Sequence, residues 1–133
     1  KIWAFTHIRS GTSIGKNCVI GEGVHIGLNV KIGNNVKIQN HALIYEGLVI
    51  KDDVFIGPGV VTTNDFLPDA AIPHTQFKKT YIEKGASVGA NSTIVCGVRI
   101  GANSLIGAGS VVTKNIDSET IAVGNPAKFL RKT

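Results

Sequence analysis

The chain has 133 residues, with 14 Lys and Arg against 9 Asp and Glu, so its formal net charge is +5. This length suits one domain with one core, and the positive charge suits anionic partners such as phosphorylated ligands, nucleic acid or an acidic membrane. Nucleic-acid binders usually cluster basic residues with aromatic ones, but here the basic residues are scattered, so we expect no nucleic acid. No apolar run approaches the roughly 20 residues of a membrane span and no signal peptide is visible, so we expect a cytoplasmic protein without a membrane span.

Isoleucine recurs every six residues through the first part of the chain. The column is Ile2, Ile8, Ile14, Ile20, Ile26, Ile32, Ile38, Ile44, Ile50 and Ile56. A second, mostly aliphatic column stands two positions earlier, and the pattern resumes from Ile82 to Val112. Two inward positions in every six residues predict a short strand followed by a turn, and fit neither an α-helix nor a hairpin.

Three such strands would make a triangular coil, and successive coils would stack at the strand spacing of about 4.8 Å. We therefore predict an all-β fold, a single-stranded parallel β-helix of about five coils over residues 1–115. The aliphatic columns would form one continuous interior, as in other solenoids. The period alone does not give the handedness of the winding.

Residues 64–79 interrupt the pattern. The distance from Ile56 to Ile82 is four six-residue steps plus two residues, and the stretch contains Pro68 and Pro73 without a clean period. We predict one loop inserted there. From residue 116 to residue 133 we expect a tail that leaves the coil and ends in a short helix carrying Lys128 and Arg131.

A coil of three six-residue steps places residues 18 positions apart on top of one another. Glu46 and Asn64 form such a pair at one corner, and Asn64 opens the loop, where sites on a rigid scaffold tend to lie. Ala90 and Ala108 form a second pair, whose small side chains leave a shallow groove. The alternatives are a turn residue for Asn64, a surface carboxylate for Glu46 and plain corner residues for the two alanines.

More specific stretches carry a resemblance to a known family. They are VKIQN at 36–40, DDVFIGP at 52–58, TN at 63–64, KGA at 84–86 and GANSTIVCG at 89–97, with GAGSVVTK at 107–114 and VGNPAK at 123–128. The chain resembles the hexapeptide-repeat, left-handed β-helix acyltransferase superfamily, and is most similar to its nucleotide-sugar 3-N-acetyltransferases. The resemblance implies left-handed winding, acetyl-CoA as cosubstrate, an amino sugar linked to UDP or dTDP from a surface-polysaccharide pathway, and a homotrimer with active sites between subunits.

The resemblance also implies a coenzyme A site that the C-terminal tail completes. Ala90 and Ala108 match positions that contact the coenzyme in relatives. The positions matching those that hold its nucleotide end are Thr113, Lys114, Lys128 and Arg131. Phosphates attract Lys and Arg through charge-assisted hydrogen bonds, although a solvated basic tail is the alternative.

Many members of the family place a histidine near the start of the loop as general base, whereas this chain has Asn64. A hydroxyl acceptor needs such a base, but an amine that titrates at about 7.7–8.0 needs far less help. The departure therefore favours an amine acceptor. Our hypothesis is direct attack of the amine on the acetyl thioester, with Asn64 and Glu46 as catalytic residues that hold the amine, and with the coenzyme thiolate as final proton acceptor.

Three other residues are candidates for substrate binding, namely His41, Tyr45 and His74. His41 sits at a different corner from Glu46, so it would reach the site only across a subunit interface. An O-acetyltransferase for a small sugar or amino acid, with His74 or His41 as base, is the alternative function.

Two further alternatives are a γ-type carbonic anhydrase and a non-catalytic β-helix scaffold. The zinc pattern of the former includes two histidines spaced by five, and no pair among the four histidines here has that spacing. Cys18 and Cys96 are also too far apart in sequence for a zinc pattern, so we expect no metal. Binding of acetyl-CoA would argue against a scaffold.

Overall fold

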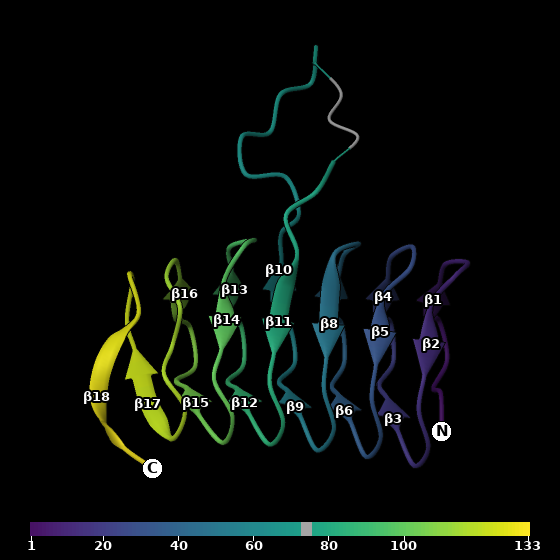
Figure 1. The fold of residues 1–133 in the computed structure, drawn as a ribbon. Coiled ribbons are helices and arrows are strands. Elements are labelled where there is room, and N and C mark those ends of the chain that lie inside the picture. Colours follow the sequence, from purple (N-terminus) through teal and green to yellow (C-terminus); the bar gives the residue numbers. More distant parts are fainter. Residues whose placement is uncertain (73–75) are drawn as a thin grey trace.

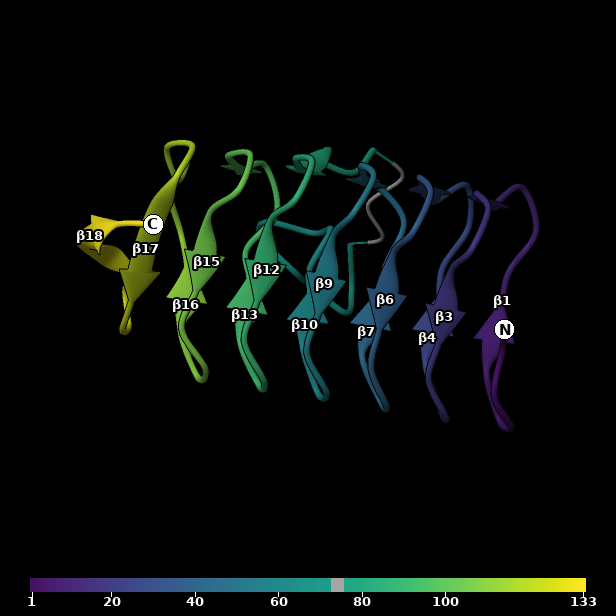
Figure 2. The same cartoon turned by 90° about the horizontal axis from the view of Figure 1, so that it is seen from below.

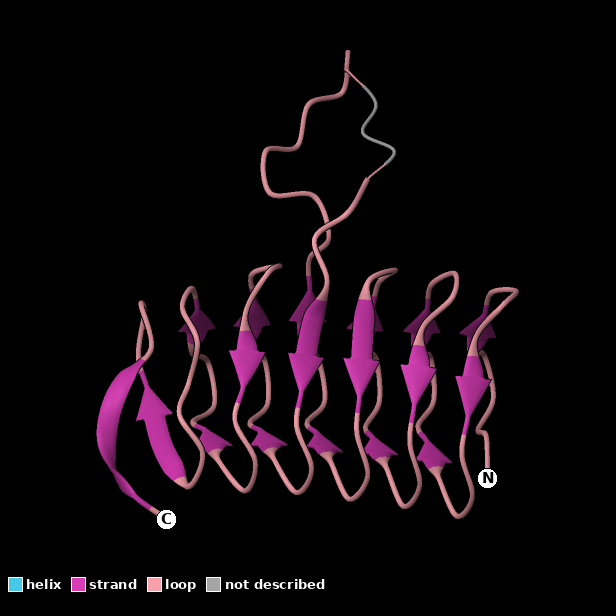
Figure 3. Ribbon diagram, in the orientation of Figure 1, coloured by secondary structure: helices cyan, strands magenta, loops and turns pink. Residues whose placement is uncertain are grey.

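The computed structural model describes residues 1–72 and 76–133, which form strands, turns and loops but no helix (Figure 3). None of these residues therefore belongs to a helix that could cross a bilayer. His74, one of the candidate bases, lies outside the described residues.

The strands form three sheets, named here in the order in which the chain visits them. Sheet I consists of β1 (His7–Ile8), β4 (His25–Ile26), β7 (Leu43–Ile44), β10 (Val61–Thr62), β13 (Thr93–Ile94) and β16 (Val111–Val112). Sheet II consists of β2 (Ser13–Ile14), β5 (Lys31–Ile32), β8 (Leu48–Ile50), β11 (Thr80–Ile82) and β14 (Arg99–Ile100). Sheet III consists of β3 (Val19–Ile20), β6 (Lys37–Ile38), β9 (Phe55–Ile56), β12 (Ser87–Val88), β15 (Leu105–Ile106), β17 (Thr120–Val123) and β18 (Lys128–Lys132).

Each of the first five coils contributes one strand to each sheet, and neighbouring coils pair in parallel, as His7 does with His25 and Ser13 with Lys31. Figure 1 shows the chain running down the near sheet II and up the far sheet I while it advances from the N-terminus to the C-terminus, which is a left-handed winding. Seen from below, the strands of sheet III lie side by side along the same axis (Figure 2). The predicted parallel β-helix is thus confirmed, and the six strands of sheet I show one coil more than the five expected.

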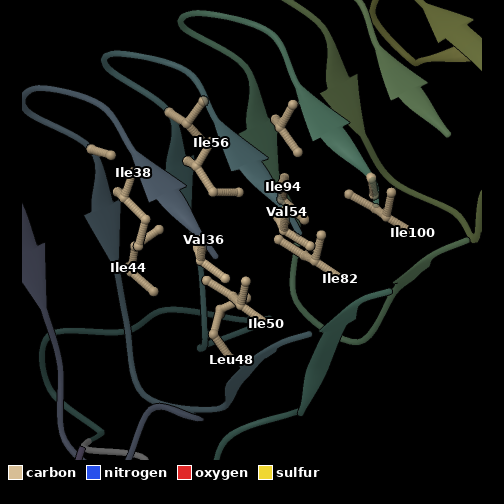
Figure 4. Close-up of a cluster of buried hydrophobic side chains, with 14 of the residues drawn as sticks. Val36, Ile38, Ile44, Leu48, Ile50, Val54, Ile56, Ile82, Ile94 and Ile100 are labelled. Atoms are coloured by element: carbon tan, nitrogen blue, oxygen red, sulfur yellow. The ribbon is translucent and has the colours of Figure 1, made fainter. Parts of the chain in front are cut away.

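The isoleucine column lines the interior. Ile38, Ile44, Ile50 and Ile56 are at most 1% exposed, and Figure 4 shows them gathered with residues of the second column, such as Val54, between the three sheets. Burying such a side chain stabilises the fold by about 1.5–3 kcal/mol. The two columns therefore hold each coil on its neighbours.

The corners of the coils place residues in the left-handed backbone region on all three edges. Between sheets II and III these residues are Asn17, Asn35, Asp53, Gly85, Asn103 and Glu119. Gly, Asn and Asp adopt positive φ most readily, whereas other side chains are disfavoured there by roughly 1–2 kcal/mol. Glu119, with φ of 56°, is the exception in this column.

We expect Glu119→Asn to raise the free energy of unfolding by about 0.5–1 kcal/mol, because Asn suits this backbone conformation better. Urea unfolding of both proteins measures the change. Asp117→Asn removes the same charge from an exposed neighbour at negative φ and is the matched control. If both substitutions raise the free energy of unfolding equally, the loss of charge rather than the backbone conformation is responsible.

The predicted loop leaves the edge between sheets I and II, between β10 and β11 (Figure 1). Its insertion changes the register, because β8 pairs with β11 so that Leu48 faces Thr80. Threonine hydroxyls secure both ends of the loop to adjoining coils. Thr63 Oγ1 accepts a hydrogen bond from Cys96 N at 3.0 Å, and Thr80 Oγ1 accepts one from Gly97 N at 3.1 Å. The loop is therefore mounted on the rigid coil at each end.

The C-terminal tail differs from the expectation. Ile116 bridges Ile100 and β17 pairs in parallel with β15, so the chain stays on the coil as far as Val123. It then reverses, and β18 pairs antiparallel with β17 at the end of sheet III (Figure 3). The predicted short helix is wrong. A helix this short would leave most of its backbone groups unsatisfied, whereas β18 pairs them with the edge of β17.

Candidate active site

Two hollows flank the base of the loop at the edge between sheets I and II. The first hollow, on the sheet I side, is lined by Tyr45, Val61, Thr62, Thr63, Asn64, Asp65 and Pro68. The second hollow, on the sheet II side, is lined by Asn29, Lys31, Glu46, Gly47, Phe77 and Lys79. The first leg of the loop thus borders one hollow and its second leg borders the other.

The coil positions Asn64 through the two threonines before it. Thr62 is fully buried, and its hydroxyl donates to Leu43 O at 3.1 Å and accepts from Tyr45 N at 3.0 Å. Thr63 is held by Cys96 on the other side. Asn64 follows at the point where the loop departs, half-buried, and its side-chain amide has no hydrogen-bond partner among the described residues. The amide is therefore free to bind a ligand in the first hollow.

Glu46 lies on the neighbouring coil of the same edge but lines the second hollow. Its carboxylate is half-buried and forms no ion pair or hydrogen bond with the described part of the chain. The structure thus brings Glu46 and Asn64 to the two sides of one loop base rather than into one hollow. Their joint hold on a substrate amine stays a prediction.

Tyr45 is one of the predicted substrate-binding residues, and it lines the first hollow. Three aromatic rings stack along sheet I next to this hollow. The centre of the His25 ring lies 5.4 Å from that of Tyr45 and 5.5 Å from that of His7. Burial away from water, together with the charges of His7 and Arg9, lowers the pKa of His25 below its ordinary value of 6.5.

The lowered pKa of His25 predicts a pH-dependent stability. The folded state disfavours the charged imidazole, so the unfolded chain binds more protons as the pH falls below about 6.5, and stability is lost in that direction. Urea unfolding between about pH 7.5 and 5.5 should show this loss, with a flatter profile for His25→Gln. His41→Gln, which removes an imidazole from another edge, is the matched control. An unchanged slope in His25→Gln would refute the prediction.

His41 lies on the edge between sheets III and I, as predicted, and not at either hollow. It occupies a left-handed corner with φ of 61°, and a Cβ added at Gly23 would meet its Nδ1 at 2.5 Å. Its side chain therefore packs over the corner of the preceding coil. Within one copy of the chain it serves as a corner residue.

The predicted coenzyme residues lie on more than one edge. Ala90 and Ala108 stack between sheets III and I, where Gly109 N donates to Ala90 O at 2.8 Å, and Ala108 lines a hollow with Phe55, Ser87 and Leu105. Lys128 is close to that edge, since it pairs with Val123, whose side chain covers Gly107.

Thr113 and Lys114 lie elsewhere, on the edge between sheets I and II, because they follow β16. Arg131 lies further along β18, opposite Ile121. One copy therefore groups Ala90, Ala108 and Lys128 but not the other three coenzyme candidates. Among the residues that the structure describes, no three His, Cys, Asp or Glu are grouped to hold a metal ion.

Sequence reasoning missed Lys31, Phe77 and Lys79 of the second hollow. The 18-residue coil could have placed Asn29 over Gly47, with Lys31 beside them. Nothing in the sequence places Phe77 and Lys79, because the loop has no period and its second leg returns to the coil at a new register.

Comparisons with known proteins match this architecture. The family described as bacterial transferase hexapeptide (six repeats) matches residues 1–28, 29–64 and 79–114, and the chain belongs to this family. Over 53 residues it is 53% identical to a dTDP-3-amino-3,6-dideoxy-alpha-D-galactopyranose 3-N-acetyltransferase of Aneurinibacillus thermoaerophilus, covering 40% of this chain and 28% of that protein. Over 89 residues it is 40% identical to a galactoside O-acetyltransferase of Lactococcus lactis subsp. lactis, covering 64% of this chain and 43% of that protein. The chain thus spans less than half the length of both relatives.

Solved structures share the fold. A hexapeptide-repeat acetyltransferase of Vibrio cholerae O1 biovar eltor, complexed with acetyl coenzyme A, superposes with a TM-score of 0.81 at 29% identity over 92% of this chain and 70% of that one. A mutant perosamine N-acetyltransferase of Caulobacter crescentus, complexed with CoA and GDP-perosamine, has a TM-score of 0.83 over 96% of this chain and 54% of that one. At 21% identity the second likeness shows the fold alone.

Proposed function

We propose that this chain acetylates the amino group of a nucleotide-linked amino sugar, of the 3-amino-dideoxy type, with acetyl-CoA as donor. The observation that carries the proposal is Asn64, a half-buried amide at the foot of the loop that has no hydrogen-bond partner among residues 1–72 and 76–133. No histidine lines either hollow among the described residues. The 53% identity to an amino-sugar N-acetyltransferase supports the same acceptor.

In the proposed reaction the amine attacks the thioester carbon directly. From the two sides of the loop base, Asn64 would accept one N–H of the amine through its Oδ1 and Glu46 would accept another, so that the nitrogen lone pair faces the carbonyl carbon. The N–C bond forms, the C–S bond breaks with its electron pair leaving on sulfur, and the thiolate then takes the proton that the nitrogen releases. Positioning of this kind supplies much of the rate enhancement when the nucleophile is already reactive.

The acetyl-CoA arm would lie along the edge that carries Ala90 and Ala108. A Cβ added at Gly89 would come within 2.5 Å of Ala108 N, so this edge is packed tightly behind a shallow outer face. Lys128 at the end of the edge would meet a phosphate. Thr113, Lys114 and Arg131 would join the same coenzyme from a neighbouring copy, which favours the homotrimer implied by the family resemblance.

Ala108→Leu tests the coenzyme edge. The larger side chain would fill the shallow hollow at exposed Ala108, so we expect the KM for acetyl-CoA to rise about tenfold or more and the KM for the sugar to stay nearly unchanged. Ala102→Leu, at another edge of the coil, is the control. If both variants raise the KM for acetyl-CoA equally, the coenzyme does not lie along the edge that carries Ala90 and Ala108.

The proposed activity is tested by screening UDP- and dTDP-linked amino sugars with acetyl-CoA and reading the release of free thiol. We expect turnover with a 3-amino sugar linked to one of these nucleotides. Thiol release that is no faster than that without acceptor across the whole panel would refute the proposal.

A further inference from the structure

The second hollow carries three charged side chains that form no ion pair with any residue the structure describes. Lys31 and Lys79 are exposed and Glu46 is half-buried. The ion pairs among the described residues join Lys84 to Asp53 and Arg99 to Glu83, so the hollow's own lysines and carboxylate are not used within the fold. Two cations and one anion in one concave site suit a ligand that has an anionic group next to a hydrogen-bond donor.

The backbone fixes this arrangement from two directions. Lys31 belongs to β5, where it lies opposite Val49 on the next coil. Lys79 comes from the second leg of the loop, which is held down because Thr80 N donates to Gly47 O at 3.0 Å. A Cβ added at Gly47 would lie 3.0 Å from Lys78 O and 3.9 Å from the Lys79 Cα, so the leg packs directly against the coil. The two lysines therefore belong to rigid parts of the structure.

The neighbouring lysine lies on the other side of the loop. Lys78 extends toward the other leg, where its Nζ lies 4.0 Å from the centre of the Phe66 ring. Lys79 and Phe77 instead line the second hollow, where Phe77 is half-buried beside Asn29. The hollow thus offers an aromatic face and a side-chain amide next to its two cations.

We propose that the second hollow binds the diphosphate of the nucleotide-linked substrate between Lys31 and Lys79, with the sugar amine directed toward Glu46. Phosphate oxygens accept charge-assisted hydrogen bonds from ammonium groups, whereas Glu46 repels phosphate and can accept an N–H of the amine. The charge pattern of the hollow therefore matches a molecule with a diphosphate at one end and an amine at the other. This inference rests on the proposed function for the identity of the sugar, but its binding test needs no acetyl transfer.

Coenzyme A also contains a diphosphate, so titration calorimetry should be carried out with dTDP, UDP and CoA separately. One of dTDP and UDP will bind the wild-type protein more tightly. We expect Lys31→Ala and Lys79→Ala each to lower the affinity for that nucleotide about tenfold, and the double variant to lower it about a hundredfold, with CoA affinity unchanged. Lys51→Ala, at an exposed lysine on another edge of the coil, is the matched control and should bind within twofold of wild type.

Glu46→Gln distinguishes binding of the diphosphate from binding of the amine. It should keep or gain affinity for the nucleoside diphosphate, but it should lose the wild-type preference for an amino-sugar nucleotide over UDP-glucose or dTDP-glucose. Wild-type nucleotide affinity in both lysine variants would overturn the inference. So would loss of CoA affinity alone, or absence of nucleoside diphosphate binding by the wild-type protein.

The outcomes also distinguish this inference from the proposed function. If the wild-type protein acetylates no amino sugar while the lysine variants still lose nucleotide affinity, the function fails and the binding site stands. If the wild-type protein acetylates an amino sugar while the lysine variants bind like wild type, the function stands and the binding site is wrong.

Discussion

Asn64→Ala is expected to lower kcat for the amino sugar about a hundredfold, with little change in the KM for acetyl-CoA. The side chain has no partner in the described protein, so its removal costs the fold little. Loss of the amide oxygen leaves the amine free to rotate away from the thioester, and misplacement by about 1 Å is enough for an effect of this size. Steady-state kinetics with each substrate varied in turn measures both parameters.

Two further variants sharpen this prediction. Asn64→Asp keeps an acceptor oxygen in the same place and should retain more activity than Asn64→Ala. Gln76→Ala changes an exposed amide on the other leg of the loop and should leave kcat near wild type. Wild-type turnover in Asn64→Ala would end the assignment of Asn64 as a catalytic residue.

The second large effect is expected in the core. Ile56→Ala should lower the free energy of unfolding by about 2–5 kcal/mol, because the change removes a fully buried side chain and leaves a cavity. Ile56 lies in register between Ile38 and Val88, so the cavity would open the contact between three coils. In a solenoid, stability depends on such nearest-neighbour interfaces.

Leu105→Ala is the matched control for Ile56→Ala. Leu105 is on the same sheet but faces outward and is 42% exposed, so we expect its loss to cost less than about 1 kcal/mol. Ile56→Val, which removes one methylene, should fall between them at about 0.5–1.5 kcal/mol. Urea midpoints measured under one set of conditions give the order. Equal destabilisation by the Ile56 and Leu105 variants would contradict the inward assignment of the isoleucine column.

The fold was predictable wherever side-chain burial repeats. Ile38, Ile44 and Ile56 are buried because each strand turns one aliphatic residue inward. This requirement produces the six-residue period of the sequence. The tail was not predictable in the same way. Its last strand, β18, forms because the edge of β17 is available for pairing, and that edge exists only after the coil has folded.

The candidate site also has a part that the sequence period predicts and a part that it does not. The positions of Asn64 and Glu46 on neighbouring coils followed from their spacing, since the coil converts 18 residues into one step along the axis. Their assignment to different hollows depends on the second leg of the loop, which returns beside Gly47. The return of the second leg depends on hydrogen bonds such as the one between Thr80 and Gly97, and no local sequence pattern predicts it.

The most direct test of the central claim compares two acceptors that differ in one group. Acetyl-CoA is incubated with a nucleotide-linked 3-amino sugar and with its 3-hydroxy counterpart, and the products are analysed by NMR. We predict that the amino sugar is converted to an amide with one thiol released per acetyl transferred, while the hydroxy sugar reacts at least about a hundredfold more slowly. An ester formed at a comparable rate would contradict the proposed mechanism, because a hydroxyl acceptor needs a general base and the mechanism assigns none.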